Sequence, residues 1–264
     1  MEWHAQAKQL TESLRLMVRP VGVRLLTADE VEGARAIRPR RDLGRKFAYC
    51  QALSVAGRMG LPVLVTGQHE GCIVVLQLFG MGKFQPLEKV PESQCAMGWV
   101  KDMETANKFV MHQVEDVLPP GVYSGFIAAP LEYMEMEPEV VVVYGTPAQV
   151  VRMVQGYGYC TGEAIESRFH GFAGTCVSGV LRTRRLNKPQ VVLPGFGDRM
   201  LARVEDHEMA FSFTLDQMEA VLEGSEDVGK RSGLAWPMKY VFYDLDFTKL
   251  NSIYPEFAQY LERF

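Results

Sequence analysis

The sequence predicts an α/β fold, or an α+β fold, in which strands alternate with capped helices. Three observations support this. Residues 139–144 form a nearly continuous β-branched run that is typical of a buried strand. Thr27 and Thr146 each follow a strand-like run, and each has Glu or Gln three residues later, as in a helix capping box. The 264 residues are 47% hydrophobic and 23% charged, enough for a substantial core.

The elements follow from periodicity and from glycine and proline stops. Helices are expected over 3–17, after Thr27, and over 44–59, 101–116 and 252–264. Strands are expected over 21–26, 61–66, 139–144, 191–193 and 208–213. Residues 73–79 fit either helix or strand, and residues 80–100 are expected to be loop. The helices that begin after Thr146 and Thr214 are expected to end at Gly156 and Gly224, because glycine favours helix C-termini.

We expect one domain over residues 1–264, with two similar halves packed as one unit. The halves are 19–120 and 121–224, and residues 225–264 form a C-terminal extension. Both halves contain a strand, a helix, a glycine-rich turn and a cysteine, so that Cys72 and Cys176 occupy the same place. The usual alternation of strands and helices explains this pattern as well as a duplication does.

Charge and cysteine usage exclude several classes of protein. A net charge of −4 predicts no general nucleic-acid binding, and the apolar runs are too short to span a bilayer. The N-terminus lacks the regions of a signal peptide, so a cytoplasmic location is expected. The five cysteines are odd in number and widely spaced in a long chain, which argues against a disulfide scaffold. The sequence has no C-x-x-C pair and no His-x-x-x-His, so the standard zinc spacings are absent. An oligomer is compatible with the sequence.

Cys72 and Cys176 are the first candidate site residues. Each closely follows a glycine and is expected to open a helix, where free amides and the macrodipole favour the thiolate. Such a thiolate suits a redox thiol, a nucleophile, or a ligand for a soft metal or an iron–sulfur cluster. Packing in a core is the alternative, because cysteine is among the most buried residue types. His69 and His170 lie nearby in sequence, but a structural or surface role is favoured for both.

The turn at residues 194–199 is a second candidate. Gly195 and Gly197 follow a strand and would let backbone amides approach a ligand, while Arg199 can pair with a carboxylate or phosphate. A tight turn with a surface salt bridge explains the pattern equally well. Basic residues also cluster at 35–46 and 182–185. Two such clusters could flank an anionic ligand, although solvated faces are the commoner explanation.

Several blocks, taken in order, resemble domain-of-unknown-function family 169, found mostly in archaea and anaerobic bacteria. The blocks are 19–24, 46–53, 70–72, 129–132, 144–149, 174–176 and 194–199. The resemblance implies one family-length unit and no settled activity. Family members often carry a second cysteine soon after the one aligned with Cys72. Residues 73–75 are Ile-Val-Val here instead, which weakens a cluster-ligand role for Cys72.

The leading hypothesis is a cytoplasmic accessory or redox protein that binds a small anionic ligand or a redox cofactor. That cofactor would be a thiol-ligated metal or an iron–sulfur cluster, in keeping with anaerobic metabolism. The site would gather Cys72, Cys176, Arg199 and the Gly195–Gly197 turn. A non-catalytic scaffold or subunit with buried cysteines and a cysteine-dependent transferase are the alternatives. The sequence identifies no catalytic residue, no particular cofactor and no metal.

Overall fold

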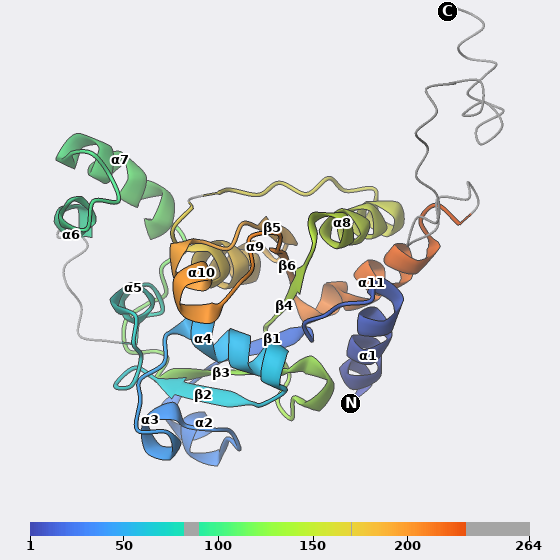
Figure 1. Ribbon diagram of the computed structural model, residues 1–264, viewed down its shortest axis with the longest axis horizontal. Coiled ribbons are helices and arrows are strands. Elements are labelled where there is room, and N and C mark those ends of the chain that lie inside the picture. The colour runs from blue at the N-terminus through green and yellow to red at the C-terminus, as the bar shows by residue number, and fades with distance from the viewer. Residues whose placement is uncertain (82–89, 170, 231–264) are drawn as a thin grey trace, which may run out of the picture.

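The computed structural model describes residues 1–81, 90–169 and 171–230. In these ranges six strands form one sheet in the order β2-β3-β1-β4-β6-β5, and helices cover both of its faces (Figure 1). All strand pairs are antiparallel. The predicted mixed fold is therefore confirmed in its α+β form, with the helices packed on an antiparallel sheet.

The strands are β1 (Val21–Leu26), β2 (Val63–Thr66), β3 (Gly125–Pro130), β4 (Val140–Gly145), β5 (Gln190–Val192) and β6 (Met209–Phe213). The α-helices are α1 (Glu2–Leu14), α2 (Ala28–Gly33), α3 (Pro39–Asp42), α4 (Tyr49–Ser54), α5 (Ile73–Leu78), α6 (Val90–Ala96), α7 (Met103–Val114), α8 (Pro147–Thr161), α9 (Arg182–Leu186), α10 (Phe196–Ala202) and α11 (Met218–Asp227). The π-helical segments are η1 (Val55–Met59) and η4 (Gly174–Leu181), and the 3-10 turns are η3 (Leu131–Tyr133) and η5 (Leu215–Gln217).

The strand order is symmetric about the β1–β4 pair. From this centre to either edge it reads first, third and second strand in chain order: β1, β3, β2 on one side and β4, β6, β5 on the other. β3 begins at Gly125, inside the second predicted half, yet it pairs with β1 and β2. A boundary between β3 and β4 therefore fits the pairing better than one at residue 120. That the halves descend from a duplication stays a prediction.

Side chains alternate across the sheet because successive residues of a strand point to opposite faces. On β4, Val140 and Val142 belong to the core that contains α4 and η4. Val141 and Val143 belong to a second core with α1, α8 and α11. A third core lies between α2 and the face of β2 and β3 that points away from the first core. In Figure 1, α2 and α3 accordingly lie below β2, and α4 lies above it.

The prediction that Gly156 and Gly224 end their helices is wrong. Helix α8 continues through Gly156 to Thr161 and ends at Gly162, which has a φ of 72°, and α11 continues through Gly224 to Asp227. A Cβ atom on Gly224 would lie 2.0 Å from the Gly156 carbonyl oxygen. These glycines instead allow α8 and α11 to pack backbone against backbone, a role that glycine fills for lack of a side chain.

We expect Gly156→Ala to lower the free energy of unfolding by about 3 kcal/mol, because the added methyl group forces the two helices apart. A Cβ atom at this position would lie 2.3 Å from the backbone nitrogen of Ser225. Gly158→Ala on the same helix is the matched control, since its nearest neighbour would be 3.5 Å away. It should stabilise the protein slightly through helix propensity. Urea unfolding curves that coincide for the two variants would refute this account.

Other predictions fare unevenly. The predicted strand 21–26 is confirmed as β1, and residues 73–78 are helical. The helix predicted over 44–59 begins only at Tyr49, and α6 lies in the segment expected to be loop. The predicted helix 252–264, and most of the C-terminal extension, lie outside the described residues. No helix in the described ranges combines the length and apolarity needed to cross a membrane.

Candidate functional site

Three cysteines from distant parts of the sequence line one pocket with a volume of about 170 Å³. Cys50 lies on α4, Cys72 is the N-cap residue of α5, and Cys176 lies on η4. They meet because the central β1–β4 pairing places α4 and η4 over the same face of the sheet. We call this cavity the thiol pocket.

The rest of the thiol pocket is mainly apolar. Its remaining lining residues are Tyr49, Val74, Val75, Trp99, Phe172, Ala173, Phe196, Gly197, Asp198, Met200 and Leu201. Trp99 and Phe172 stack with ring centroids 4.9 Å apart. The buried Tyr49 hydroxyl has no hydrogen-bond partner among the described residues. The cavity is therefore an apolar site with a few polar groups.

Cys72 and Cys176 do not occupy equivalent places, so that prediction is wrong. Cys72 follows β2 and caps α5, whereas Cys176 precedes β5. In the symmetric strand order, the position equivalent to Cys72 is Gly195, which is the N-cap residue of α10 after β5. The counterpart of Cys176 is Cys50, on the helix that precedes β2. Sequence reasoning missed Cys50, although it lies within the block 46–53 that resembles the family.

The thiol pocket favours the neutral form of its three cysteines, which agrees with the packing alternative rather than with a thiolate at Cys72 or Cys176. Burial raises the pKa of Cys50 and of Cys176 well above the usual value, and the nearby carboxyl of Asp198 adds to both shifts. Burial also raises the pKa of Cys72, although the amides of Val74 and Val75 oppose it. Desolvation thus outweighs the favourable helix terminus. Protonated thiols are poor nucleophiles, which gives no support to a cysteine-dependent transferase.

Glu70 lies two residues before Cys72, contacts its backbone N–H group and is 2% exposed. Its Oε1 accepts the backbone N–H groups of Cys72 at 2.8 Å and of Tyr49 at 3.2 Å. Its Oε2 is buried and has no hydrogen-bond partner in the described part of the chain. Burial raises the pKa of Glu70 to about 8 and outweighs these hydrogen bonds. The segment that carries Cys72 is thus fixed by a carboxyl that is mostly protonated at neutral pH.

Asp198 holds the predicted turn in place. Its Oδ2 accepts the N–H groups of Gly195 at 2.8 Å and of Thr175 at 3.3 Å, and its Oδ1 accepts the Thr175 hydroxyl. A Cβ atom on Gly195 would lie 2.2 Å from the Phe172 carbonyl oxygen. Gly195 is therefore required for close packing of the chain, and its amide is already used by Asp198.

Arg199 does not line the thiol pocket. Its guanidinium donates to the Glu205 carbonyl at 2.7 Å and lies 3.5 Å from the carboxylate of Asp206. Gly197 does line the pocket, and its carbonyl oxygen accepts the Cys50 thiol at 3.4 Å. Of the predicted site residues, the structure thus brings Cys72, Cys176 and Gly197 together and places Gly195 and Arg199 outside the lining.

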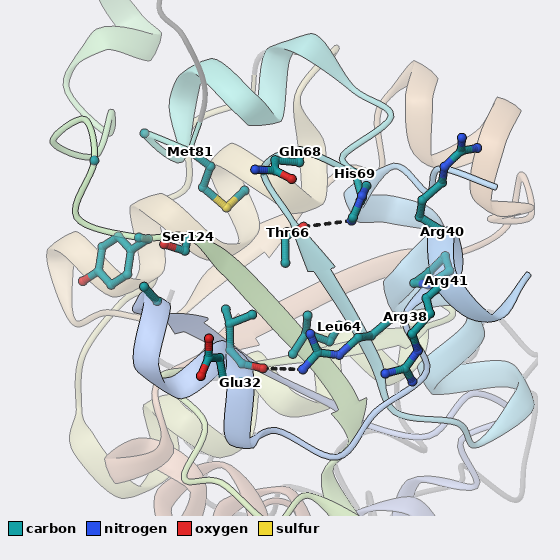
Figure 2. A pocket seen from close by; sticks show the side chains of 17 residues that line it. Glu32, Arg38, Arg40, Arg41, Leu64, Thr66, Gln68, His69, Met81 and Ser124 are labelled. Atoms are coloured by element: carbon teal, nitrogen blue, oxygen red, sulfur yellow. Dashed lines mark hydrogen bonds between the residues drawn. The ribbon is translucent and has the colours of Figure 1, made fainter. Parts of the chain in front are cut away.

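His69 belongs to a different cavity. Its Nδ1 lies 3.1 Å from the Thr66 hydroxyl, and it lines a larger pocket beside α3 (Figure 2). His170 lies outside the described residues. Within the described ranges, no three His, Cys, Asp or Glu side chains are placed to hold a metal ion. A metal in the thiol pocket would therefore require its cysteines to move.

Fold and site together define an antiparallel α+β protein with a buried, thiol-lined apolar pocket. The chain belongs to domain-of-unknown-function family 169, described as uncharacterised ArCR, whose match covers residues 9–224. It is 27% identical over 132 residues to the uncharacterized protein MJ0308 of Methanocaldococcus jannaschii. That alignment covers 49% of this chain and 54% of MJ0308, so the chain spans about half the length of this curated relative. No solved structure matches the chain significantly.

Proposed function

We propose that this chain is a small-molecule-binding protein whose thiol pocket takes the apolar part of a ligand or redox cofactor. The observation that carries the proposal is the meeting of Cys50, Cys72 and Cys176 in one cavity. Neutral thiols are soft, polarisable groups that favour contact with aromatic rings and with thiol-seeking metals. Binding at such a site suits an accessory or redox protein better than a cysteine nucleophile.

The size and wall of the pocket favour a ring-sized group. Its volume of about 170 Å³ is close to that of apolar cavities that bind benzene in other proteins. The mouth is formed partly by Phe196 and Met200 of α10, which are 56% and 61% exposed. A ligand larger than one ring would rest its remaining apolar surface there, which would remove these side chains from water.

Anaerobic purification is the direct test of the cofactor form of this proposal. We expect the protein to retain a chromophore, a metal or a small organic molecule, detected by its absorption spectrum, metal analysis and mass spectrometry. Cys72→Ser and Cys176→Ser should reduce this retention. Cys160→Ser is the matched control, because Cys160 is exposed on α8 and does not line the pocket. A colourless wild-type protein free of metal and small molecules would eliminate the cofactor form.

Thiol reactivity provides a further prediction. At pH 7 we expect iodoacetamide to label Cys50, Cys72 and Cys176 at least about tenfold more slowly than Cys160, because alkylation requires the thiolate. Burial raises the pKa of each pocket thiol. The pKa of Cys160 is also raised, but its thiol is exposed and open to the reagent. The rates are measured by mass spectrometry of the labelled peptides. Equal rates at the four cysteines would contradict the neutral, buried thiols described above.

A pair of mercury reagents separates a binding pocket from a sealed core. Phenylmercuric acetate is a neutral molecule. Its mercury bonds to the thiol sulfur while acetate leaves the mercury and takes the thiol proton as acetic acid, so it should react at the pocket cysteines of the folded protein. p-Mercuribenzoate carries an added carboxylate and should be excluded from a wall that is almost wholly apolar. Reaction of neither reagent before denaturation would instead favour the non-catalytic scaffold. The raised pKa values of Cys50, which is buried, and of Cys176, which is half-buried, keep this alternative open.

A further inference from the structure

We propose that a second pocket, beside α3, binds a small molecule that carries phosphate or carboxylate groups. The pocket has a volume of about 730 Å³ and is lined by Arg38, Arg40 and Arg41 together with Gln68 and His69. We call it the arginine pocket. It differs from the thiol pocket in chemistry, so its ligand class is a separate inference. The segment 66–72 contributes residues to both cavities.

Cationic charge is left without a carboxylate partner in the arginine pocket. The side chains of Arg38 and Arg40 donate to the carbonyls of Val31 and Gly44, and neither forms an ion pair within the described residues. Arg41 pairs with Asp42 at 2.6 Å. A backbone carbonyl neutralises only part of a guanidinium charge, so the Arg38 and Arg40 side chains still attract anions.

The other basic cluster of the sequence behaves differently. Arg184 pairs with Glu139 at 2.7 Å, and Arg185 pairs with Asp116 at 2.6 Å. Those arginines hold elements of the fold together and have carboxylate partners. The sequence suggested that two basic clusters could flank one anion. Only the cluster at 35–46 supports an anion site, because its arginines line a cavity.

The polar groups of the arginine pocket are arranged unevenly, as Figure 2 shows. Arg40 and His69 project at one side of the pocket, and Glu32 lies at the opposite side. Because the Nδ1 of His69 contacts the Thr66 hydroxyl, its Nε2 remains for a ligand. The arginine side would bind the anionic group, and Glu32 would accept hydrogen bonds from hydroxyl or amino groups at the other end.

The size of the cavity favours more than a single inorganic ion. A volume of about 730 Å³ lies within the usual range for sites of whole small molecules. Guanidinium groups match the spacing of two oxygens on phosphate or carboxylate, so both groups share the same recognition chemistry. The overall charge of −4 means that anions are attracted locally rather than by the whole protein.

Calorimetric titration of the full chain with inorganic pyrophosphate, and separately with citrate, tests the proposal and distinguishes phosphate from carboxylate recognition. We expect saturable, salt-sensitive binding of one or both. Arg40→Gln and His69→Gln should each weaken binding about tenfold, as expected for a lost charge-assisted hydrogen bond. Arg45→Gln is the matched control, because Arg45 is exposed in the same cluster but does not line the pocket. Its affinity should stay within about twofold of wild type.

A variant that is expected to strengthen binding keeps the test decisive if a substituted arginine disturbs folding. Glu32→Gln removes a negative charge that faces the cavity, so it should strengthen pyrophosphate binding by about threefold. Absence of saturable binding for both anions would overturn the proposal. Equal weakening by Arg40→Gln and Arg45→Gln would also overturn it, because net charge alone would then explain the affinity.

Discussion

Replacement of Glu70 by Gln should make the protein markedly more stable than wild type at pH 9 and leave its stability nearly unchanged at pH 5. Burial raises the pKa of Glu70 from its usual value of 4.5 to about 8. Between pH 4.5 and about pH 8, Glu70 has lost its proton in the unfolded state but still retains it in the folded state. The stability of the wild type therefore falls as the pH rises through this window, and its Glu70 contribution levels off above it.

The size of the effect follows from the width of that window. One unit of pKa is worth about 1.4 kcal/mol, so the Glu70 shift from 4.5 to about 8 corresponds to roughly 5 kcal/mol. Glutamine can keep the hydrogen bonds from the N–H groups of Cys72 and Tyr49 without ever ionising. Its amide nitrogen would take the place of Oε2. Because Oε2 has no hydrogen-bond partner among the described residues, the substitution breaks no hydrogen bond there.

Urea unfolding at several pH values measures this prediction. The difference in free energy of unfolding between Glu70→Gln and wild type should grow steadily from pH 5 to pH 8 and then remain constant. Glu223→Gln is the control, since Glu223 is exposed on α11, and its difference curve should be flat. A flat curve for Glu70→Gln as well would show that the carboxyl is ionised in the folded state at neutral pH.

The sequence predicted correctly those elements that have a capping box at their start or consist of a long apolar run. Thr146 accepts the Gln149 N–H at 3.4 Å, and the Gln149 side chain accepts the Thr146 N–H at 2.7 Å, as the capping box requires. The strand predicted over 139–144 is observed, with a shift of one residue, as β4 over Val140–Gly145. β3 was missed because Gly125–Pro130 contains two alanines and no alternation, although all six residues are buried. Its place between β2 and β1 in the sheet comes from pairing with both strands.

Glycine shows why some local signals mislead. Gly162 ends α8 in a left-handed conformation, as the usual signal predicts, whereas Gly156 lies within the same helix. The two look alike in the sequence, and only the approach of α11 distinguishes them. The same limit applies to the site. Neither Cys50 nor Asp198 could be assigned to the thiol pocket before the strand order was known, because the pocket depends on β1 lying beside β4.

Asp198→Ala should cost roughly 4 kcal/mol of stability, because three buried donors would lose their shared acceptor. These donors are the N–H of Gly195 and the N–H and hydroxyl of Thr175. Asp198→Asn is a sharp control. Its side-chain oxygen can accept both N–H groups, while its amide can donate to the Thr175 hydroxyl oxygen, so it should cost only about 1 kcal/mol. Urea unfolding measures both values.

The same pair of variants links stability to the thiol pocket. Asp198 joins η4, which carries Cys176, to the start of α10, which supplies Phe196 and Met200 to the pocket mouth. Loss of this link should open the mouth, so Asp198→Ala should speed iodoacetamide labelling of Cys176 in native buffer. Asp198→Asn keeps the link but removes the carboxyl that raises the pKa of Cys176, so it should label only slightly faster than wild type and much more slowly than Asp198→Ala. If both variants label slowly, local opening does not control access, and the pocket is closed by other contacts.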